Sequence, residues 1–295
     1  MNSIKVDILL PVYNGVDFLK AQITSILDQT HANFNLIIRD DQSTDGSALI
    51  IHELSNLDSR ILIVDIGSSN IGLVKSIEYL LKISESPYIM FADQDDVWLN
   101  NKVELFLNKA TEISNDYPCL IHSDCFVTDK NLNVSHRFMG SKPFNSGLAY
   151  SLFHFYVQGS STMINQKLKN EALPFPVDIY LHDRYLHIVS EICGIRLYLD
   201  TPTMYYRQHE KNLVGSKTLF EKIRGNILEK KKFYLIEDRA LILSILENKY
   251  TNNDLLKKYK MLTDDQVNRF FKLYLLIKYK ISLRWKERFL LLFKN

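Results

Sequence analysis

The sequence changes abruptly from apolar to acidic at residues 88–96, which read Tyr88-Ile89-Met90-Phe91-Ala92-Asp93-Gln94-Asp95-Asp96. A short apolar run that stops at polar residues is typical of a buried strand at its carboxyl end. This stretch therefore predicts a strand at Tyr88–Ala92 that is followed directly by three carboxylates.

The residues around this strand alternate strand and helix signals. Apolar runs predict strands at 5–11, 34–39 and 61–66, and helical spacing predicts helices over 15–29, 45–57, 70–83 and 102–113. Ser43, Thr44 and Asp45 are candidates to cap the second helix. The rhythm predicts an α/β fold with a mostly parallel central sheet flanked by helices. Right-handed crossovers place the carboxyl ends of such strands along one edge, where ligands bind.

Polar and acidic residues follow three of the four strands. They comprise Pro11–Gly15 after the first, Asp40 and Asp41 after the second, and Asp93–Asp96 after the fourth. Carboxylates gathered at one edge repel each other unless a cation or hydrogen-bond donors satisfy them. Oxygen ligands favour Mg²⁺ or Mn²⁺ over zinc. The chain has no G-x-G-x-x-G and no Walker loop, which disfavours a dinucleotide enzyme and a P-loop ATPase.

The later part of the chain is less regular. Strands are expected at 120–122, 125–128 and 195–199, a polar loop around 130–144, and a helix around 179–193. From residue 216 the pattern is helical and rich in Lys, Leu and Tyr.

Composition and charge are those of an ordinary globular protein with a basic tail. The 295 residues are 46% hydrophobic and 24% charged. The N-terminus does not read as a signal peptide, and no run of 18 apolar residues predicts a spanning helix. Three cysteines without a CxxC pair are expected to be free thiols in a reducing cytoplasm. Residues 217–295 carry 19 Lys and Arg against 9 Asp and Glu, a net +10, whereas residues 1–216 carry 17 against 25, a net −8.

Three stretches combine into a family pattern. They are Val6-Asp7-Ile8-Leu9-Leu10-Pro11-Val12-Tyr13-Asn14-Gly15, Ile37-Ile38-Arg39-Asp40-Asp41-Gln42-Ser43-Thr44-Asp45-Gly46-Ser47 and Phe91-Ala92-Asp93-Gln94-Asp95-Asp96-Val97-Trp98. Together they resemble glycosyltransferase family 2, the inverting enzymes of the GT-A fold, strongly over about 4–110 and more loosely to about 215. The last stretch, with His182-Asp183 and Tyr206-Arg207-Gln208-His209, is most similar to bacterial rhamnosyltransferases and O-antigen or capsule transferases.

The resemblance implies a GT-A catalytic domain over 1–215 and a basic helical region over 216–295. The nucleotide-sugar-binding half would be about 1–100 and the acceptor half 101–215. Pro11 and Tyr13 would border the base, and Asp41 would accept a hydrogen bond from N3–H of uracil or thymine. The resemblance assigns the pair Asp93 and Asp95 to ribose and metal and favours Asp95 as the metal ligand. Asp96 adds charge, and the resemblance does not rank it against Asp95.

The acceptor half would supply the remaining groups. Asp183 matches the family's catalytic base, although it could also be only a helix cap. The small residues Gly159 and Ser160, together with His182, would contact the acceptor. His209 would be a second ligand of Mn²⁺ or Mg²⁺, and Arg207 would offset phosphate charge.

The implied function is a single in-line displacement from a nucleotide-sugar, dTDP-rhamnose or a UDP-hexose, to a hydroxyl of a lipid-linked glycan. The basic, aromatic tail favours peripheral association with the inner face of the cytoplasmic membrane. Packing of the tail on the core or on a second subunit, as in a homodimer, is the alternative, and the acidic body disfavours nucleic acid. A non-catalytic nucleotide-sugar-binding module is the competing function. A nucleotidyltransferase is a weaker one, because Pro11–Gly15 is not a Gly-rich basic phosphate loop.

Overall fold

The computed structural model describes residues 4–64, 69–140, 147–148, 151, 157–177, 179–210, 234–264 and 266–278. The strands are β1 (Val6–Val12), β2 (Phe34–Asp40), β3 (Ile61–Ile63), β4 (Tyr88–Phe91), β5 (Val97–Trp98), β6 (Cys119–Thr128), β7 (Val134–Arg137), β8 (Thr162–Asn165) and β9 (Ile195–Arg207). The helices are α1 (Leu19–Leu27), α2 (Ser47–Leu57), α3 (Leu73–Ile83), α4 (Lys102–Ala110), α6 (Gln166–Ala172), α7 (His182–Cys193), α9 (Tyr234–Lys249), α10 (Asp254–Thr263) and α11 (Arg269–Lys278), with a 3₁₀ turn, η1 (Gly159–Ser161).

The chain divides into two compact units. Unit 1 comprises Met1–Phe144, Tyr156–Pro174 and His182–Ser216, and unit 2 comprises Asn145–Phe155, Phe175–Leu181 and Lys217–Asn295. All nine strands named above lie in unit 1 and form one sheet. The expected division into a catalytic domain over 1–215 and a helical region over 216–295 stays a prediction.

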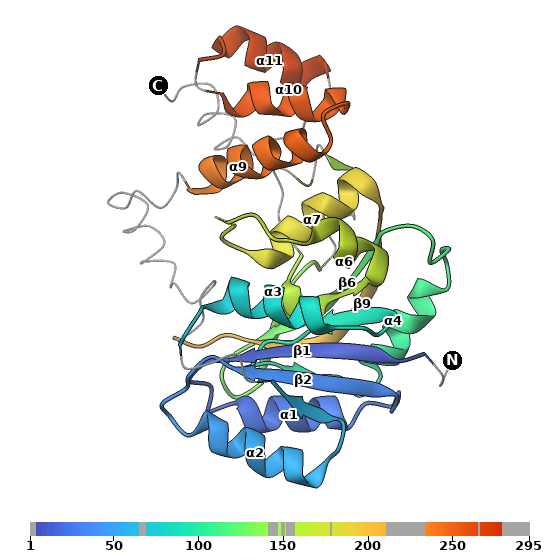
Figure 1. The fold of residues 1–295 in the computed structure, drawn as a ribbon, viewed down its shortest axis with the longest axis vertical. Coiled ribbons are helices and arrows are strands. Elements are labelled where there is room, and N and C mark those ends of the chain that lie inside the picture. Colours follow the sequence, from blue (N-terminus) through green and yellow to red (C-terminus); the bar gives the residue numbers. More distant parts are fainter. Residues whose placement is uncertain are drawn as a thin grey trace. The chain divides into compact units, whose positions relative to one another are not determined.

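The first half of the sheet has the order β3-β2-β1-β4, and all of its strands are parallel. Every residue of β1 is buried, because helices cover both faces of this strand. Alternate residues of β1 pack with α1 in one core cluster, which includes Val6, Ile8, Ile23 and Ile26. Figure 1 shows α1 and α2 along one side of β1 and β2, and α3 along the other. The alternation of strands and helices predicted for residues 5–113 is thus present, with shorter elements.

The second half of the sheet is mixed and differs from the prediction. Its order continues β8-β6-β9-β5, with β8 antiparallel to β4 and β6, and β9 parallel to β6. The strands expected at 120–122 and 125–128 are one strand, β6. Ser123 and Asp124 interrupt its apolar pattern, but both are buried and paired, Ser123 with Thr203 at 2.6 Å and Asp124 with Arg137 at 2.8 Å.

Three other expectations for this half are corrected. The polar loop around 130–144 contains β7, which pairs with β6. The strand expected to end at 199 runs on to Arg207 as β9 and is thirteen residues long. The strands β5 and β8 and the helix α6 have no counterpart in the sequence prediction. The extension of β9 matters most for function, because it carries the chain back to the carboxyl ends of β1 and β4.

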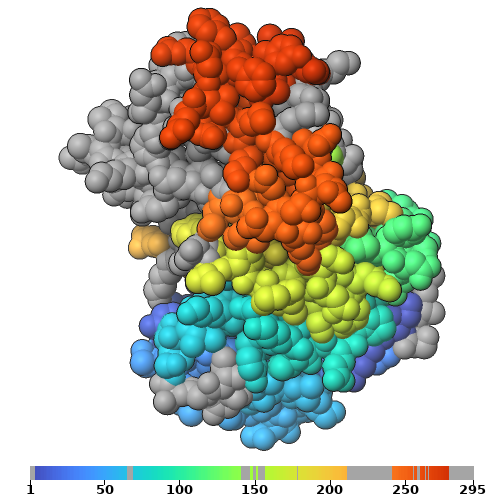
Figure 2. All heavy atoms as spheres, turned by 45° about the horizontal axis from the view of Figure 1, so that its top comes forward, coloured from blue at the N-terminus to red at the C-terminus, as the bar shows by residue number. Residues whose placement is uncertain are grey.

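The described part of unit 2 contains the helices α9, α10 and α11, and α10 packs against both others. Figure 2 shows their surface in orange and red. The expected helical character of the C-terminal region is therefore present over these three segments. Within the described residues, no helix is both long enough and apolar enough to cross a membrane.

Candidate active site

The loops after β1 and β2 are tied to each other by short polar side chains. The backbone N–H of Gly15 donates to the hydroxyl of Ser47 at 2.9 Å. Burial raises the pKa of the Asp45 carboxyl, but the Ser47 hydroxyl, which donates to it at 2.6 Å, and the backbone N–H groups of Val16 and Ser47, each at 3.0 Å, outweigh burial and lower the pKa. Gly46, at a φ of 98°, occupies the N-cap of α2, so Asp45 links two loops and is not the cap residue.

Gln94 fastens the loop after β1 to the acidic loop after β4. Its Oε1 accepts from the backbone N–H of Tyr13 at 2.8 Å, and its Nε2 donates to the Tyr13 carbonyl at 3.0 Å. Gly15 leaves room for this side chain, because a Cβ at that position would lie 2.6 Å from Gln94 Cδ. The side chain of Tyr13 is exposed and Pro11 is buried in the sheet. The expected contacts of Pro11 and Tyr13 with a base stay predictions.

Asp41 is held firmly at the end of β2. Its Oδ1 accepts from Arg39 Nη1 at 2.5 Å and from the backbone N–H of Ile71 at 2.8 Å, and its Oδ2 accepts from the backbone N–H of Gly72 at 2.7 Å. Both charged side chains are buried. Oδ2 keeps capacity for one more donor, as the expected bond from a pyrimidine N3–H requires. The Arg39 contact and the two backbone donors were not predicted from the sequence.

The acidic loop between β4 and β5 concentrates negative charge. Burial, together with the charges of Asp95 and Asp183, raises the pKa of Asp93 to about 7. Burial also raises the pKa of Asp96, and the charges of Asp95 and Asp93 contribute to this rise. One oxygen of Asp96, Oδ2, has no hydrogen-bond partner in the described part of the chain. The loop therefore holds more negative charge than its described donors neutralise.

The end of β9 brings Arg207 and His209 to this loop. His209 Nε2 lies 2.9 Å from Asp95 Oδ2. Arg207 donates from Nε to the Asp95 carbonyl at 2.8 Å, and its backbone N–H donates to Asp96 Oδ1 at 3.1 Å. The sequence prediction grouped these residues, and the structure places them within hydrogen-bond distance of each other.

Phe18, just before α1, supports both of these basic side chains. Its ring centroid lies 4.7 Å from that of His209, and the Arg207 guanidinium carbon lies 4.5 Å from the same centroid. An aromatic face stabilises a cation above it and fixes the plane of a neighbouring ring. No sequence signal marked this residue, because its helical spacing suggested only a core position.

Asp183 lies in the first turn of α7, opposite the acidic loop. Its Oδ2 accepts from the backbone N–H of Gly159 at 3.1 Å, and its Oδ1 accepts from that of Arg184 at 2.7 Å. Burial raises the pKa of its carboxyl. The residue before it, His182, packs on Phe91 of β4, so Asp183 lies beside the strand that leads into the acidic loop. The structure thus brings the expected base to the expected donor side.

The neighbours of Asp183 are packed tightly. His182 is buried against the ring of Phe91, at 5.5 Å between centroids, and neither ring nitrogen has a hydrogen-bond partner among the described residues. Burial lowers its pKa, which favours the neutral ring. A Cβ at Gly159 would lie 2.9 Å from His182 Nε2, so a larger residue there would displace the imidazole. This close approach explains the small residue at the start of η1.

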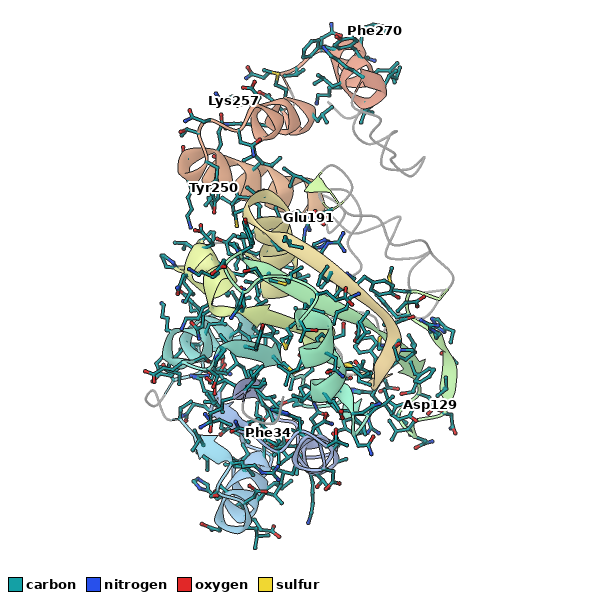
Figure 3. All side chains as sticks on the ribbon, turned by 90° about the vertical axis from the view of Figure 1, so that its right-hand side faces the viewer. Phe34, Asp129, Glu191, Tyr250, Lys257 and Phe270 are labelled. Carbon is teal, nitrogen blue, oxygen red and sulfur yellow. The ribbon has the colours of Figure 1, made fainter. Side chains whose placement is uncertain are left out.

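The far end of α7 is anchored to the sheet by buried charge. Arg196 of β9 pairs with Glu191, which Figure 3 labels on α7. Arg196 also lies 2.9 Å from His122 Nε2 on β6. Burial raises the pKa of Glu191, but His187 and Arg196 outweigh this and lower it to about 2. Because Asp183 is in the first turn of the same helix, this anchor fixes the helix that carries the expected base.

The chemistry of the acidic loop fits a divalent cation with few protein ligands. Asp95 and His209 meet from two separate elements, and the unpartnered oxygen of Asp96 lies in the same loop. Among the described residues, no cluster of three or more His, Cys, Asp or Glu side chains is arranged to hold a metal. Two protein ligands suffice when phosphate oxygens supply the others, as is usual for Mg²⁺.

The fold and the site define a class of transferase. The model of the family described as Glycosyl transferase family 2 matches residues 7–171, and the chain belongs to that family. This confirms the family that the sequence was found to resemble, glycosyltransferase family 2.

Two curated relatives extend the likeness. The dTDP-rhamnosyl transferase RfbG of Shigella flexneri is 26% identical over 267 residues, which cover 85% of this chain and 89% of RfbG. WfaP of Escherichia coli, a UDP-Glc:alpha-D-GlcNAc-diphosphoundecaprenol beta-1,3-glucosyltransferase, is 28% identical over 218 residues, which cover 72% of this chain and 80% of WfaP. The chain thus has relatives in bacterial rhamnosyl and glucosyl transfer.

Solved structures show the same fold. S. aureus TarS 1–349, crystallised with UDP, superposes with a TM-score of 0.60 at 17% identity and covers 97% of this chain and 77% of TarS 1–349. The mannosyltransferase PcManGT of Pyrobaculum calidifontis, with GDP-Man and Mn²⁺, superposes with a TM-score of 0.54 at 10% identity, covering 97% and 89%. The predicted fold class, α/β of the GT-A type, is confirmed.

Proposed function

We propose that this chain is an inverting glycosyltransferase that moves a sugar from a dTDP- or UDP-linked donor to a hydroxyl of a lipid-linked glycan. One observation carries the proposal: His182 packs on Phe91 of β4 at 5.5 Å between ring centroids, which places the next residue, the expected base Asp183, beside the strand that leads into the acidic loop. RfbG supports dTDP-rhamnose as the donor, and WfaP supports a UDP-sugar and a lipid-linked acceptor. The process would be bacterial cell-surface polysaccharide biosynthesis on the cytoplasmic side of the membrane.

The donor would lie along the carboxyl ends of β1, β2 and β4. Pro11 and the exposed Tyr13 would border the base, and Asp41 Oδ2 would accept from its N3–H. Asp93 would bind the ribose. Arg207, whose guanidinium stacks on Phe18, would approach the diphosphate.

Sugar transfer would then be a single displacement. Asp183 takes the proton of the acceptor hydroxyl, and that oxygen attacks the anomeric carbon opposite the nucleotide, whose diphosphate leaves. Gly159, Ser160 and His182 would contact the acceptor. The bond to the acceptor forms as the bond to the diphosphate breaks, so the anomeric centre inverts.

Asp95 and His209 would hold Mn²⁺ or Mg²⁺ at the diphosphate. When bound, the cation neutralises charge that develops on the leaving group. The 2.9 Å contact between these two side chains, one from the loop after β4 and one from the segment after β9, supports this assignment.

A panel of nucleotide-sugars tests the proposal. We expect UDP-glucose or dTDP-rhamnose with Mn²⁺ to raise the unfolding temperature and to be hydrolysed slowly. CDP and GDP-mannose should do neither, because cytosine lacks the N3–H that Asp41 would accept and guanine is larger. Stabilisation by GDP-mannose alone would contradict the donor assignment. Binding of a uridine or thymidine donor without hydrolysis or transfer would favour the competing function, a non-catalytic nucleotide-sugar-binding module.

Phe18 gives a prediction for the site that holds His209 and Arg207. We expect Phe18→Leu to lower kcat/KM by about 5- to 30-fold, because the two ring contacts together are worth about 1–2 kcal/mol. Mn²⁺ titration of the nucleotide complex should show weaker metal binding in this variant. Phe18→Tyr keeps the ring and serves as the matched control. Equal metal affinity in wild type and Phe18→Leu would contradict this role.

Membrane association is proposed for α11. Four of its apolar residues share one helical face at spacing i, i+3, i+4 and i+7, and all are exposed: Phe270 75%, Leu273 40%, Tyr274 49% and Ile277 69%. Figure 3 labels Phe270 on this helix. Lys278 lies 5.2 Å from the centroid of the Tyr274 ring, so a cation borders the face. Apolar and cationic groups in this arrangement suit an anionic bilayer surface.

We expect the double variant Phe270→Ser, Ile277→Ser to bind phosphatidylglycerol vesicles at least about tenfold more weakly in co-sedimentation. Burial of such side chains is worth about 1.5–3 kcal/mol each, and about 1.4 kcal/mol is tenfold in affinity. Leu57→Ser, at an exposed apolar position of α2, is the matched control. Unchanged vesicle binding combined with loss of a dimer in light scattering would show that this face contacts a second subunit.

A further inference from the structure

Lys102, at the start of α4, is a fully buried lysine beside the candidate active site. Its side chain is 0% exposed. Burying an ammonium is costly unless other groups replace its water shell, so a lysine in this position requires partners. Burial lowers the pKa of Lys102, and the charges of Asp96 and Asp93 oppose that shift.

Three elements surround the ammonium. Nζ donates to the carbonyl of Ser160 in η1 at 2.5 Å, lies 3.3 Å from Sδ of Met204 on β9, and lies 3.8 Å from the ring centroid of Trp98 on β5. These partners are a carbonyl, a thioether and an aromatic face, none of which carries charge. Within the described residues, no carboxylate oxygen lies within 4.0 Å of Nζ in an ion pair.

The Ser160 carbonyl connects Lys102 to the expected base. Ser160 follows Gly159, whose backbone N–H donates to Asp183 Oδ2 at 3.1 Å. A shift of this turn would move the donor that orients Asp183. The same shift would disturb the close contact between Gly159 and His182, which leaves no space for a larger residue at position 159.

Lys102 also joins the turn to the acidic loop. It lies six residues after Asp96, beyond β5, and is the first residue of α4. Its charge acts on both Asp96 and Asp93. The side chain therefore spans the two halves of the site, the acidic loop on one side and the turn that holds Asp183 on the other.

We propose that Lys102 is a positioning residue, whose ammonium holds the Gly159–Ser161 turn, and through it Asp183, in register with the acidic loop. This inference rests on the proposed glycosyl transfer with Asp183 as base. Lys102 touches neither donor nor acceptor and acts only through the Ser160 carbonyl. A packing role alone would be served equally well by an unbranched apolar side chain of the same length.

The test compares Lys102→Met, which keeps the apolar stem, with Lys102→Arg, which keeps the charge and the N–H donors. Lys169→Met is the matched control, because Lys169 Nζ also donates to a backbone carbonyl, that of Ser84 at 2.5 Å, away from the carboxylates. The assays are hydrolysis of UDP-glucose and dTDP-rhamnose with Mn²⁺, and thermal stabilisation by UDP and dTDP with Mn²⁺.

We expect Lys102→Met to lower kcat for hydrolysis by about 10- to 100-fold, the effect of a misplaced catalytic group. The donor KM and the stabilisation by nucleotide should stay within about threefold of wild type, because donor contacts are unchanged. Lys102→Arg should retain more kcat than Lys102→Met, and Lys169→Met should match wild type.

Several results would overturn the inference. One is a kcat of Lys102→Met equal to that of Lys169→Met, and another is a lower kcat for Lys102→Arg than for Lys102→Met, which is the order that packing alone predicts. Weaker nucleotide binding with unchanged kcat would place the effect on the donor side. Failure of both variants to fold would assign the ammonium to the fold and not to the site. If wild type itself neither hydrolyses nor transfers any donor, the proposed function has failed, and the inference fails with it.

Discussion

Asp183→Asn is expected to lower kcat for sugar transfer by about 10²–10⁴-fold, the usual contribution of a positioned general base. Asparagine has nearly the same shape, and its carbonyl oxygen can still accept from the Gly159 backbone N–H, so the turn should keep its place. Binding of UDP or dTDP with Mn²⁺ should be unchanged, since Asp183 belongs to the acceptor side. Steady-state kinetics combined with calorimetric titration of the nucleotide separates the two quantities.

The pKa of Asp183 adds two independent checks. Because burial raises this pKa and the base must be ionised, wild-type activity should fall as pH falls through it. A raised pKa also means that the folded state binds the proton more tightly than the unfolded state, so ionised Asp183 costs stability at neutral pH. Asp183→Asn should therefore unfold at the same or a higher temperature. Asp116→Asn, in an exposed loop, controls for the loss of one charge.

A large fall in stability of Asp183→Asn would favour the alternative role of this residue as a structural helix cap. Unchanged kcat would exclude it as the base. Wild-type turnover together with both results would leave Asp93, another carboxyl of the site, as the next candidate.

The first half of the fold was predictable because its signals are local. Every residue of β1 is buried and nearly all are apolar, and the helix that follows has apolar residues at helical spacing. Right-handed crossovers then determine which strand ends meet, so Asp41 and Asp95 could be assigned to one edge from the sequence.

In the second half, parts of β6, β9 and α7 were predicted, but the full lengths of the strands and their order in the sheet were not, because these depend on partners distant in sequence. The strand β6 contains buried polar residues such as Asp124, and its burial is made acceptable by Arg137 and by the backbone N–H groups of Cys125 and Met139. The strand β5 has two residues and exists through pairing with β9, about a hundred positions later. No local pattern carries that information.

The site shows the same division. Asp95, Asp183 and His209 stand in short motifs that a sequence displays. Phe18 and Lys102 act through contacts with residues that are far away in the chain. An aromatic just before a helix and a lysine in the first turn of one usually have ordinary structural roles. Residues that position the site without touching the ligands can therefore be identified only from a structure.

Asp95→Ala is expected to have the other large effect, a fall in kcat/KM of about 10²–10³-fold. That range corresponds to about 3–4 kcal/mol of stabilisation of the leaving diphosphate by a cation. His209→Ala should have a smaller effect, because Asp95 supplies the negative charge and the imidazole is a neutral ligand. Mn²⁺ should strengthen UDP or dTDP binding in wild type, but not in Asp95→Ala.

Metal removal distinguishes a ligand from a residue that binds the donor directly. If Asp95 acts only through the cation, EDTA should lower wild type to the level of Asp95→Ala and should do little more to the variant, because two changes that remove one interaction are not additive. If Asp95 instead contacts the sugar or ribose, the losses of activity caused by EDTA and by the substitution should add. Full wild-type activity in EDTA would exclude a metal mechanism, and the negative charge of the acidic loop would then have to be met by cations such as Arg207 and Lys102.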